Sequence, residues 1–94
     1  MFELTGFQRD LLYAIASQSQ PSGQQVKEVL ERDLDEVRHG RLYPNLDTLV
    51  DEGLVEKGQI DRRTNYYQIT DAGEELLRER RAWENEQVES LADS

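Results

Sequence analysis

The stretch RHGRLYPNLDTLVDEG, residues 38–53, decides the fold that this chain is expected to adopt. Its large apolar residues recur at the spacing that places them on one side of an amphipathic helix. These residues are Leu42, Leu46, Leu49 and Val50. Pro44 is tolerated in a first turn, and Gly53 suits a helix end. We therefore predict a helix over residues 38–52 that starts near residues 39–42.

The side of this helix that faces away from the apolar residues carries hydrogen-bonding groups. Arg41, Asn45 and Thr48 lie on that side, and Arg38 and His39 stand at the N-terminal end. That end also has unpaired N–H groups with a partial positive charge, which suit a phosphate. A helix that reads the major groove needs an apolar back and such a front. An ordinary surface helix shows the same pattern, so this stretch alone leaves both interpretations open.

The size and composition of the chain favour one small domain over an enzyme. Its 94 residues contain no cysteine, which excludes disulfides, thiolate zinc sites and a cysteine nucleophile. His39 is the only histidine, and no serine or carboxylate is spaced to form a triad with it. No metal-ligand spacing occurs either. We therefore expect no catalytic residue, no metal site and no cofactor.

The net charge of −9 argues at first against a nucleic-acid partner, because phosphate repels an acidic chain. The acidity lies in the flanks: residues 1–37 have a net charge of −4 and residues 65–94 a net charge of −5. Residues 38–64 are balanced, with five basic and five acidic residues. The chain also has two lysines against nine arginines. High acidity with few lysines resembles proteins of salt-loving archaea, in which DNA binding must tolerate high salt.

The chain carries no pattern of a targeting or membrane segment. No apolar run approaches the length of a membrane span, and the first residues do not have the pattern of a signal peptide. We therefore expect a cytoplasmic protein without a membrane partner.

Two helices are expected before the central one. The first follows Thr5, whose side chain fits a capping box with that of Gln8, and it runs towards Ser19 with apolar residues at helical spacing. The loop QSQPSG, residues 18–23, separates it from a second helix over residues 23–32. The second and central helices then form the pair of a helix-turn-helix.

After the central helix the apolar period changes to that of strands. Residues 54–59 and 65–70 are strand-like, and residues 60–64 form the short turn between them. Arg62 and Arg63 stand at its tip. Charges on a hairpin tip are commonly only solvated, but adjacent arginines are costly in so acidic a chain unless they meet an anion. We interpret this hairpin as a basic wing.

A last helix is expected over residues 71–94, capped by Thr70 or Asp71. Its large apolar residues, which we predict at a dimer interface, are Leu76, Leu77, Trp83, Val88 and Leu91. Trp83 lies too far along the helix for three short helices to cover, which suggests a partner surface. A second copy of the helix is the simplest partner, because most soluble oligomers are symmetric homo-oligomers. The alternative is that the helix folds back and Trp83 caps the core.

The order of elements specifies a mainly α fold with a small β-hairpin (α+β), a winged helix-turn-helix. We assign residues 1–70 to a DNA-binding domain and residues 71–94 to a C-terminal dimerisation helix, within one structural unit. In such a motif the second helix of the pair enters the major groove. The residues predicted to contact DNA are Arg38, His39, Arg41, Tyr43, Asn45, Thr48, Arg62 and Arg63.

These residues suit different parts of a duplex. Arg41 can make a bidentate contact with guanine and Asn45 one with adenine. The Tyr43 hydroxyl can reach a phosphate, while Arg62 and Arg63 suit the neighbouring backbone or minor groove. A two-fold dimer is expected to place its recognition helices about 34–36 Å apart, which matches one turn of a palindromic operator.

Two segments, HGRLYPNLDTLVDEGLVEKG at residues 39–58 and RRTNYYQITDAG at residues 62–73, resemble the PadR family of winged-helix transcriptional regulators. The matching residues are Leu42, Tyr43, Pro44, Leu46, Leu49, Gly53, Leu54, Tyr66, Tyr67, Thr70 and Gly73. FQRDLLYAIA, residues 7–16, is similar to haloarchaeal members. The chain departs from the family in its short C-terminal helix and in Arg38, where many members have a small capping residue.

The resemblance implies a dimeric, sequence-specific DNA-binding regulator, often a repressor, whose C-terminal helix supplies the dimer contact. The alternative is a winged-helix adaptor that binds a protein of the transcription machinery, which an acidic surface suits. Arg41, Arg62 and Arg63 separate the two hypotheses. A DNA binder is expected to lose affinity for DNA when they become alanine. An adaptor is expected to lose little affinity for its partner unless its interface uses the same face.

Overall fold

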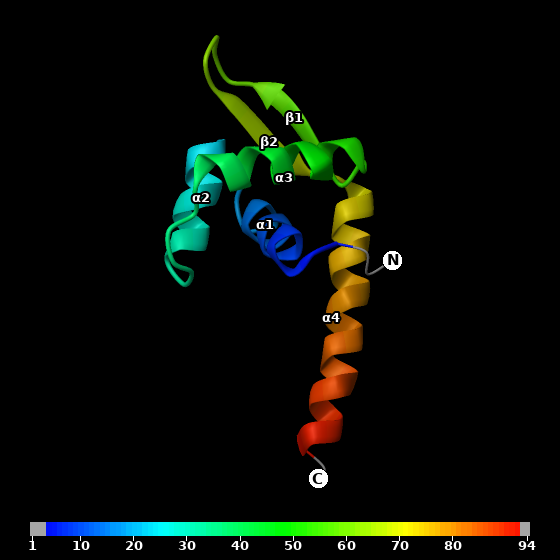
Figure 1. The fold of residues 1–94 in the computed structure, drawn as a ribbon. Helices are drawn as coiled ribbons and strands as arrows, with labels where there is room; N and C mark the ends of the chain where they lie inside the picture. Colours follow the sequence, from blue (N-terminus) through cyan, green and yellow to red (C-terminus); the bar gives the residue numbers. More distant parts are fainter. Residues whose placement is uncertain (1–3, 93–94) are drawn as a thin grey trace.

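A computed structural model describes residues 4–92, and its elements follow the order expected from the sequence (Figure 1). The elements are α1 (Gly6–Ala16), α2 (Gly23–Glu31), α3 (His39–Asp51), β1 (Val55–Gln59), β2 (Asn65–Ile69) and α4 (Asp71–Ala92). The prediction of a mainly α, winged helix-turn-helix fold is therefore confirmed. The ends of the predicted segments at residues 1–3 and 93–94 lie outside the described residues.

The first two helices begin at reciprocal caps. The Thr5 hydroxyl accepts from the Gln8 N–H at 3.1 Å, and the Gln8 side chain accepts from the Thr5 N–H at 3.1 Å. Ser22 and Gln25 make the same exchange at the start of α2, at 3.2 and 2.8 Å. Each box satisfies two N–H groups that a helix start leaves unpaired. The capping box predicted at Thr5 is thus confirmed.

A glycine ends α3 as the sequence predicts. Gly53 has a φ of +76°, in the left-handed region that glycine adopts without steric cost. The Leu54 N–H donates to the Leu49 carbonyl at 3.0 Å, and the Gly53 N–H donates to the Val50 carbonyl at 3.0 Å. This pair of bonds is a Schellman ending, and it turns the chain from α3 into β1.

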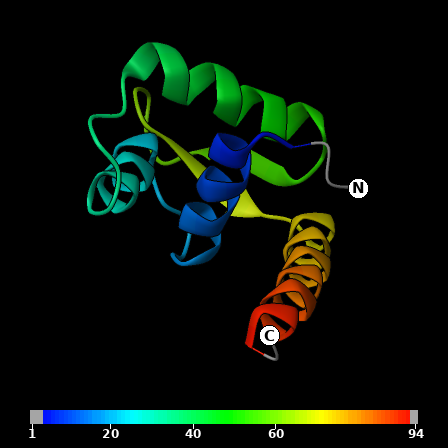
Figure 2. The same cartoon turned by 60° about the horizontal axis from the view of Figure 1, so that its bottom comes forward.

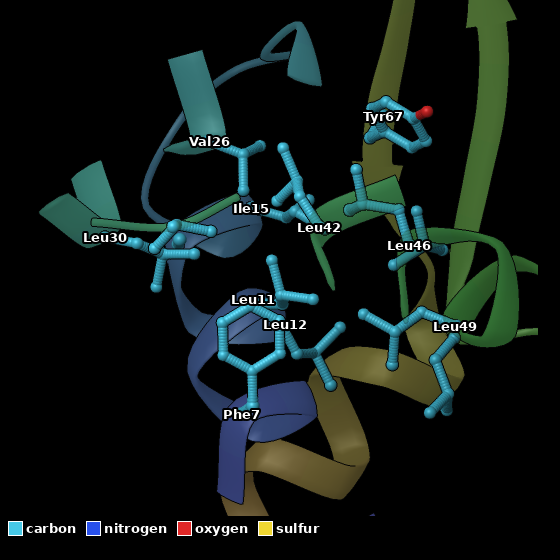
Figure 3. Close-up of a cluster of buried hydrophobic side chains, with 14 of the residues drawn as sticks. Phe7, Leu11, Leu12, Ile15, Val26, Leu30, Leu42, Leu46, Leu49 and Tyr67 are labelled. Atoms are coloured by element: carbon cyan, nitrogen blue, oxygen red, sulfur yellow. The ribbon is translucent and has the colours of Figure 1, made fainter. Parts of the chain in front are cut away.

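The core lies between α1, α2, α3 and the inner face of the hairpin (Figure 3). Leu42, Leu46 and Leu49 are fully buried, and Val50 is partly buried against them. The other fully buried large side chains are Leu11, Leu12, Ile15, Pro21, Val26, Val55 and Tyr67. The predicted apolar side of the central helix is confirmed, and its burial decides which side chains of α3 face outward.

β1 and β2 form an antiparallel hairpin in which Gly58 lies opposite Tyr66. The loop between α1 and α2 adds to this sheet. The Tyr67 N–H donates to the Pro21 carbonyl at 2.8 Å, and Ser22 forms a bridge with Tyr66. The start of α2 is therefore fixed against β2, close to the wing.

Thr70 and Gly73 close the junction between the hairpin and α4. The Thr70 hydroxyl donates to the Gly53 carbonyl at 2.7 Å and accepts from the Gly73 N–H at 3.1 Å. The Thr70 N–H donates to the Leu54 carbonyl at 3.0 Å. Gly73 lies so close to that carbonyl that a Cβ atom on it would collide with the oxygen. The segment from Thr70 to Gly73 thus holds the base of α4 against the end of α3.

α4 is one continuous helix that runs away from the body, in the direction opposite to the wing (Figures 1 and 2). The alternative in which it folds back over the core is therefore wrong. Leu77 is only 7% exposed and Leu76 packs against the same core, so these two anchor α4 to its own domain rather than presenting the dimer surface predicted for them. Trp83, Val88 and Leu91 are exposed, by 41%, 60% and 74%.

Candidate nucleic-acid interface

The N-terminal half of α3 presents the basic residues that the sequence singled out. Arg38 is the N-cap residue, but its side chain makes no capping hydrogen bond and is exposed. His39 and Arg41, in the first turn, are exposed as well. The helix start therefore has N–H groups that no side chain caps, beside two guanidinium groups. This end of α3 suits a phosphate or the acceptor atoms of guanine.

α1 holds one edge of α3 through polar contacts. The Arg41 guanidinium stacks on the Phe7 ring, 3.9 Å from its centroid. The Asn45 side-chain oxygen accepts from Gln8 Nε2 at 3.0 Å, and its nitrogen donates to the Arg41 carbonyl at 2.7 Å. The stacking covers one face of the Arg41 guanidinium and leaves the N–H groups at its edge available to an acceptor. Asn45, by contrast, is already held by α1 and by its own helix, with one lone pair and one N–H of its amide left for adenine, a restriction that sequence reasoning missed.

His39 and Tyr43 form the other edge of α3. Their rings pack edge to face, with centroids 5.6 Å apart. The Tyr43 ring lies across Gly23 at the start of α2, where an added Cβ would stand 2.7 Å from the Tyr43 hydroxyl oxygen. Tyr43 is therefore held against α2 while remaining 37% exposed. The Tyr43 hydroxyl lies where α2 and α3 touch, so a ligand that contacts both helices can bind it.

The C-terminal half of α3 suits DNA less well than the sequence suggested. The Thr48 hydroxyl donates to the Pro44 carbonyl at 3.1 Å, within the helix. Asp47 and Asp51 are exposed, and Lys57 Nζ lies 3.8 Å from the Asp47 carboxylate. Carboxylates repel phosphate, so we expect contact with a duplex to be confined to the first two turns of α3.

An aspartate shapes the wing tip and leaves its arginines exposed. The Asp61 carboxylate accepts from the N–H groups of Arg63 and Thr64, both at 2.9 Å. The backbone bond from Arg63 holds the pKa of Asp61 below its ordinary value. Arg62 and Arg63 are exposed beside this turn. The tip therefore presents two guanidinium groups on a backbone held by a carboxylate.

Acidification is expected to loosen the wing tip. The pKa of Asp61 is lower in the folded protein than the ordinary value of 3.8. The hydrogen bonds to its carboxylate are therefore fully present above pH 3.8, and they are lost as the pH falls through the folded-state pKa. NMR titration of the Arg63 and Thr64 amides checks this, since both resonances should shift together below about pH 4. In Asp61→Asn, the control, they should not move with pH in this range. A midpoint above the ordinary value of an aspartate would contradict the assignment.

The wing tip and the N-terminal end of α3 lie on the same side of the molecule (Figures 1 and 2). Arg63 and Thr64 line a cavity of about 210 Å³ together with Tyr43 of α3 and Gly23 of α2. Within residues 4–92, the arginines of the two projections form no ion pair with a carboxylate. These arginines are Arg38, Arg41, Arg62 and Arg63. The structure thus brings together the two basic projections that the sequence predicts.

Other parts of the described chain have a different character. A groove of about 440 Å³ between α1 and α2 is lined by Tyr13, Leu30 and Leu34 among others, and no basic side chain from residues 4–92 lines it. In that range no three His, Asp or Glu side chains are grouped to hold a metal ion. None of the helices described is long and apolar enough to cross a membrane.

Residues 11–79 match the sequence profile of the family described as Transcriptional regulator PadR-like. A comparison with curated proteins found no significant match. Among solved structures, RosR of H. salinarum is 37% identical with a TM-score of 0.80, over 97% of this chain and 92% of RosR. A PadR-like transcription factor from Bacteroides fragilis is 21% identical with a TM-score of 0.81, over 90% of this chain and 85% of that one. FabT of Streptococcus pneumoniae, solved in complex with DNA, is 20% identical with a TM-score of 0.75, over 98% of this chain and 62% of that one.

The two more distant structures share the fold alone. The profile match and the similarity to RosR go further, because together they cover the helix-turn-helix, the wing and the start of α4. The family consists of transcription regulators, which confirms the expectation that the chain is not an enzyme. The chain belongs to the PadR-like family of transcriptional regulators.

Proposed function

We propose that this protein represses transcription by binding a palindromic DNA operator as a homodimer. The first two turns of α3 lie in the major groove, and wing residues 60–64 lie along the adjacent backbone or minor groove. The observation that carries the proposal is that, among the described residues, the arginines of two neighbouring projections have no acidic partner. The family resemblance supports repression, and the DNA complex of FabT supports a duplex as the ligand of this fold.

The acidity of the chain is compatible with this function in a cell rich in salt. The similarity to an H. salinarum protein supports such an origin. At about 1 M salt, charges more than about 3 Å apart in solvent are largely screened. The net charge of −9 then opposes binding little, while arginines in direct contact with phosphates still act.

The direction of α4 suits a dimer that leaves the DNA-binding side open. Because α4 extends away from the wing, a contact between two copies of it covers neither α3 nor the wing tip (Figure 1). In the proposed dimer, two-fold symmetry sets the α3 helices about 34–36 Å apart, so that they enter successive turns of the major groove.

The arginine series tests DNA binding. Arg62→Ala with Arg63→Ala is expected to weaken binding to every duplex sequence, and to reduce the slope of log affinity against log salt by about 2 per protomer. Arg41→Ala is expected to cost about 1–3 kcal/mol and to relax specificity at one base pair. Mobility-shift titrations with random and selected duplexes, repeated across salt concentrations, measure both effects.

Arg78→Ala is the matched control for these variants. Arg78 lies on α4 and pairs with Glu74 at 3.2 Å and Glu75 at 3.8 Å, so its loss should leave the salt slope unchanged. If selection yields no preferred sequence, and the wild-type protein binds no better than the Arg62, Arg63 variant, the protein is an adaptor and not a DNA-binding regulator.

A further inference from the structure

The cavity between α2, α3 and the wing has the size and lining of an anion site. Ser22, Gly23 and Gln24 contribute the start of α2, Tyr43 comes from α3, and residues 63–65 come from the wing. Its volume of about 210 Å³ equals that of about seven water molecules at ~30 Å³ each, enough for a phosphate group but not for a base pair. The lining drawn from residues 4–92 includes no carboxylate.

Tyr67 of β2, a residue whose ring is buried in the core, adds its hydroxyl to this lining. The residue is 1% exposed, and its hydroxyl has no hydrogen-bond partner among residues 4–92. Figure 3 shows the hydroxyl pointing away from the buried leucines. A hydroxyl that opens into a cavity without a protein partner is available to donate to a ligand there.

The Tyr67 hydroxyl is protonated at neutral pH and can donate a hydrogen bond. Burial, together with the charge of Asp47 and the neighbouring Tyr43, raises the pKa of Tyr67 above its ordinary value of 10.0. Asp47 is the acidic group that acts on this site from α3, and Lys57 lies 3.8 Å from its carboxylate. A protonated phenol that lacks an acceptor suits an anionic oxygen.

The start of α2 supplies further donors. The N–H groups of Gly23 and Gln24 stand in the first helical turn and have no partner among the described residues. α2 has 9 residues, and their aligned peptide dipoles give its N-terminus a partial positive charge that favours an anion. Arg63 adds a cation from the opposite wall, and Tyr43 adds a second hydroxyl. Every polar group described here can donate a hydrogen bond to an anion.

We propose that this cavity binds one phosphodiester of the duplex backbone, with Tyr67 donating from the floor and the α2 N-terminus, Tyr43 and Arg63 from the walls. This inference rests on the proposed DNA-binding function and adds to it a contact that joins both helices of the motif to the wing. The first helix of such a pair crosses the backbone, which places its N-terminus beside a phosphate. Tyr67 then acts as a DNA-positioning residue within the core.

Tyr67→Phe tests the assignment, because it removes only the hydroxyl. Affinity for a duplex selected from a random pool is expected to fall about tenfold per protomer, as for the loss of a hydrogen bond to a charged group. The thermal midpoint should be unchanged or higher, since the hydroxyl has no hydrogen-bond partner within residues 4–92. The salt slope should also be unchanged, because no cation is lost. Tyr66→Phe, on the opposite face of the same strand, is the control and should bind as the wild type does.

Phosphate-by-phosphate neutralisation identifies the ligand. One methylphosphonate is placed in turn at each position of the selected duplex, and affinity is measured for wild type and Tyr67→Phe. We expect one position in each half-site at which the neutral linkage weakens the wild type by a larger factor than it weakens Tyr67→Phe, with the two factors differing by about tenfold. If the two losses multiply at every position, the hydroxyl does not meet a phosphate and the inference is overturned.

Gly23→Ala gives an independent test through the opposite wall. An added Cβ stands 2.7 Å from the Tyr43 hydroxyl oxygen and must displace the ring from the start of α2. The Tyr43 ring is partly exposed and can move, so the fold should persist while affinity for the duplex falls. At the phosphate identified above, the neutral linkage should weaken Gly23→Ala less than it weakens the wild type. Equal affinity of wild type, Tyr67→Phe and Gly23→Ala would overturn the inference and leave the proposed function standing. A wild-type protein that binds no duplex would overturn both.

Discussion

Replacing Gly73 by alanine is expected to lower the free energy of unfolding by about 3 kcal/mol, at the upper end of the range for over-packed sites. The added Cβ would collide with the Leu54 carbonyl oxygen and stand 2.7 Å from Ile69 Cγ1. That carbonyl cannot withdraw freely, because it accepts from the Thr70 N–H at 3.0 Å. The loss is large against the ~5–15 kcal/mol that stabilises a typical domain. Urea unfolding of both proteins measures it, and the midpoint temperature should fall by about 4–8 °C per kcal/mol.

Gly40→Ala is the matched control for Gly73→Ala. Both glycines lie in the first turn of a helix, but a Cβ on Gly40 meets nothing within 4 Å. Helix propensity then favours alanine over glycine by about 0.5–1 kcal/mol, so this variant should be as stable as the wild type or slightly more stable. If the two alanine variants unfold at the same urea concentration, the close approach of α4 to the Leu54 carbonyl has no energetic importance.

The parts of the fold that the sequence predicted are those set by local chemistry. The capping box at Thr5 and the helix end at Gly53 involve residues within a few positions of each other. The buried side of α3 follows from helical spacing alone, because Leu42 and Leu46 must face the same way. Local rules also placed the hairpin and the start of α4, where Thr70 is one of the two predicted caps.

The parts that the sequence did not predict depend on contacts between distant segments. Asn45 has the right chemistry for adenine, but Gln8, 37 positions away, already holds its side-chain oxygen. The spacing within α4 placed Leu77 with the dimer residues, yet its side chain lies in the core beside α1. The Tyr67 hydroxyl gives no sequence signal at all, since alternation in the strand marks it only as an inward residue. A site assembled from three elements is visible only once the elements are packed.

Trp83→Ala is expected to convert the proposed homodimer to a monomer at micromolar concentration. Trp83 is 41% exposed on a helix that extends from the body, and the Arg80 guanidinium lies 4.5 Å from its ring centroid. A tryptophan at the centre of an interface commonly contributes 2 kcal/mol or more, and a two-fold contact loses it twice. The dimer dissociation constant should therefore rise by about a factor of 1,000, as about 4 kcal/mol implies. Light scattering across protein concentrations measures it.

Ile60→Ala is the matched control for the dimer, because Ile60 is an exposed apolar residue of the wing, 58% exposed, on the other end of the molecule. Ile60→Ala should leave the dimer intact.

In Trp83→Ala, loss of the dimer should also weaken operator binding by about 10²–10⁴, because binding at one half-site no longer raises the effective concentration at the other. A wild-type protein that is monomeric at micromolar concentration would overturn the dimer and, with it, the palindromic operator.

Salt gives the dimer prediction a signature that separates it from DNA binding. Residues 82–92 contain Glu84, Glu86 and Glu89 and no basic residue, so two copies of this part of α4 repel each other. Salt screens that repulsion and strengthens the burial of Trp83, Val88 and Leu91, so the dimer should tighten as salt rises. Contact with phosphate weakens over the same range because fewer counterions are released. Operator affinity should therefore fall less steeply with salt than the number of arginine contacts predicts, and in Trp83→Ala it should fall with the full slope.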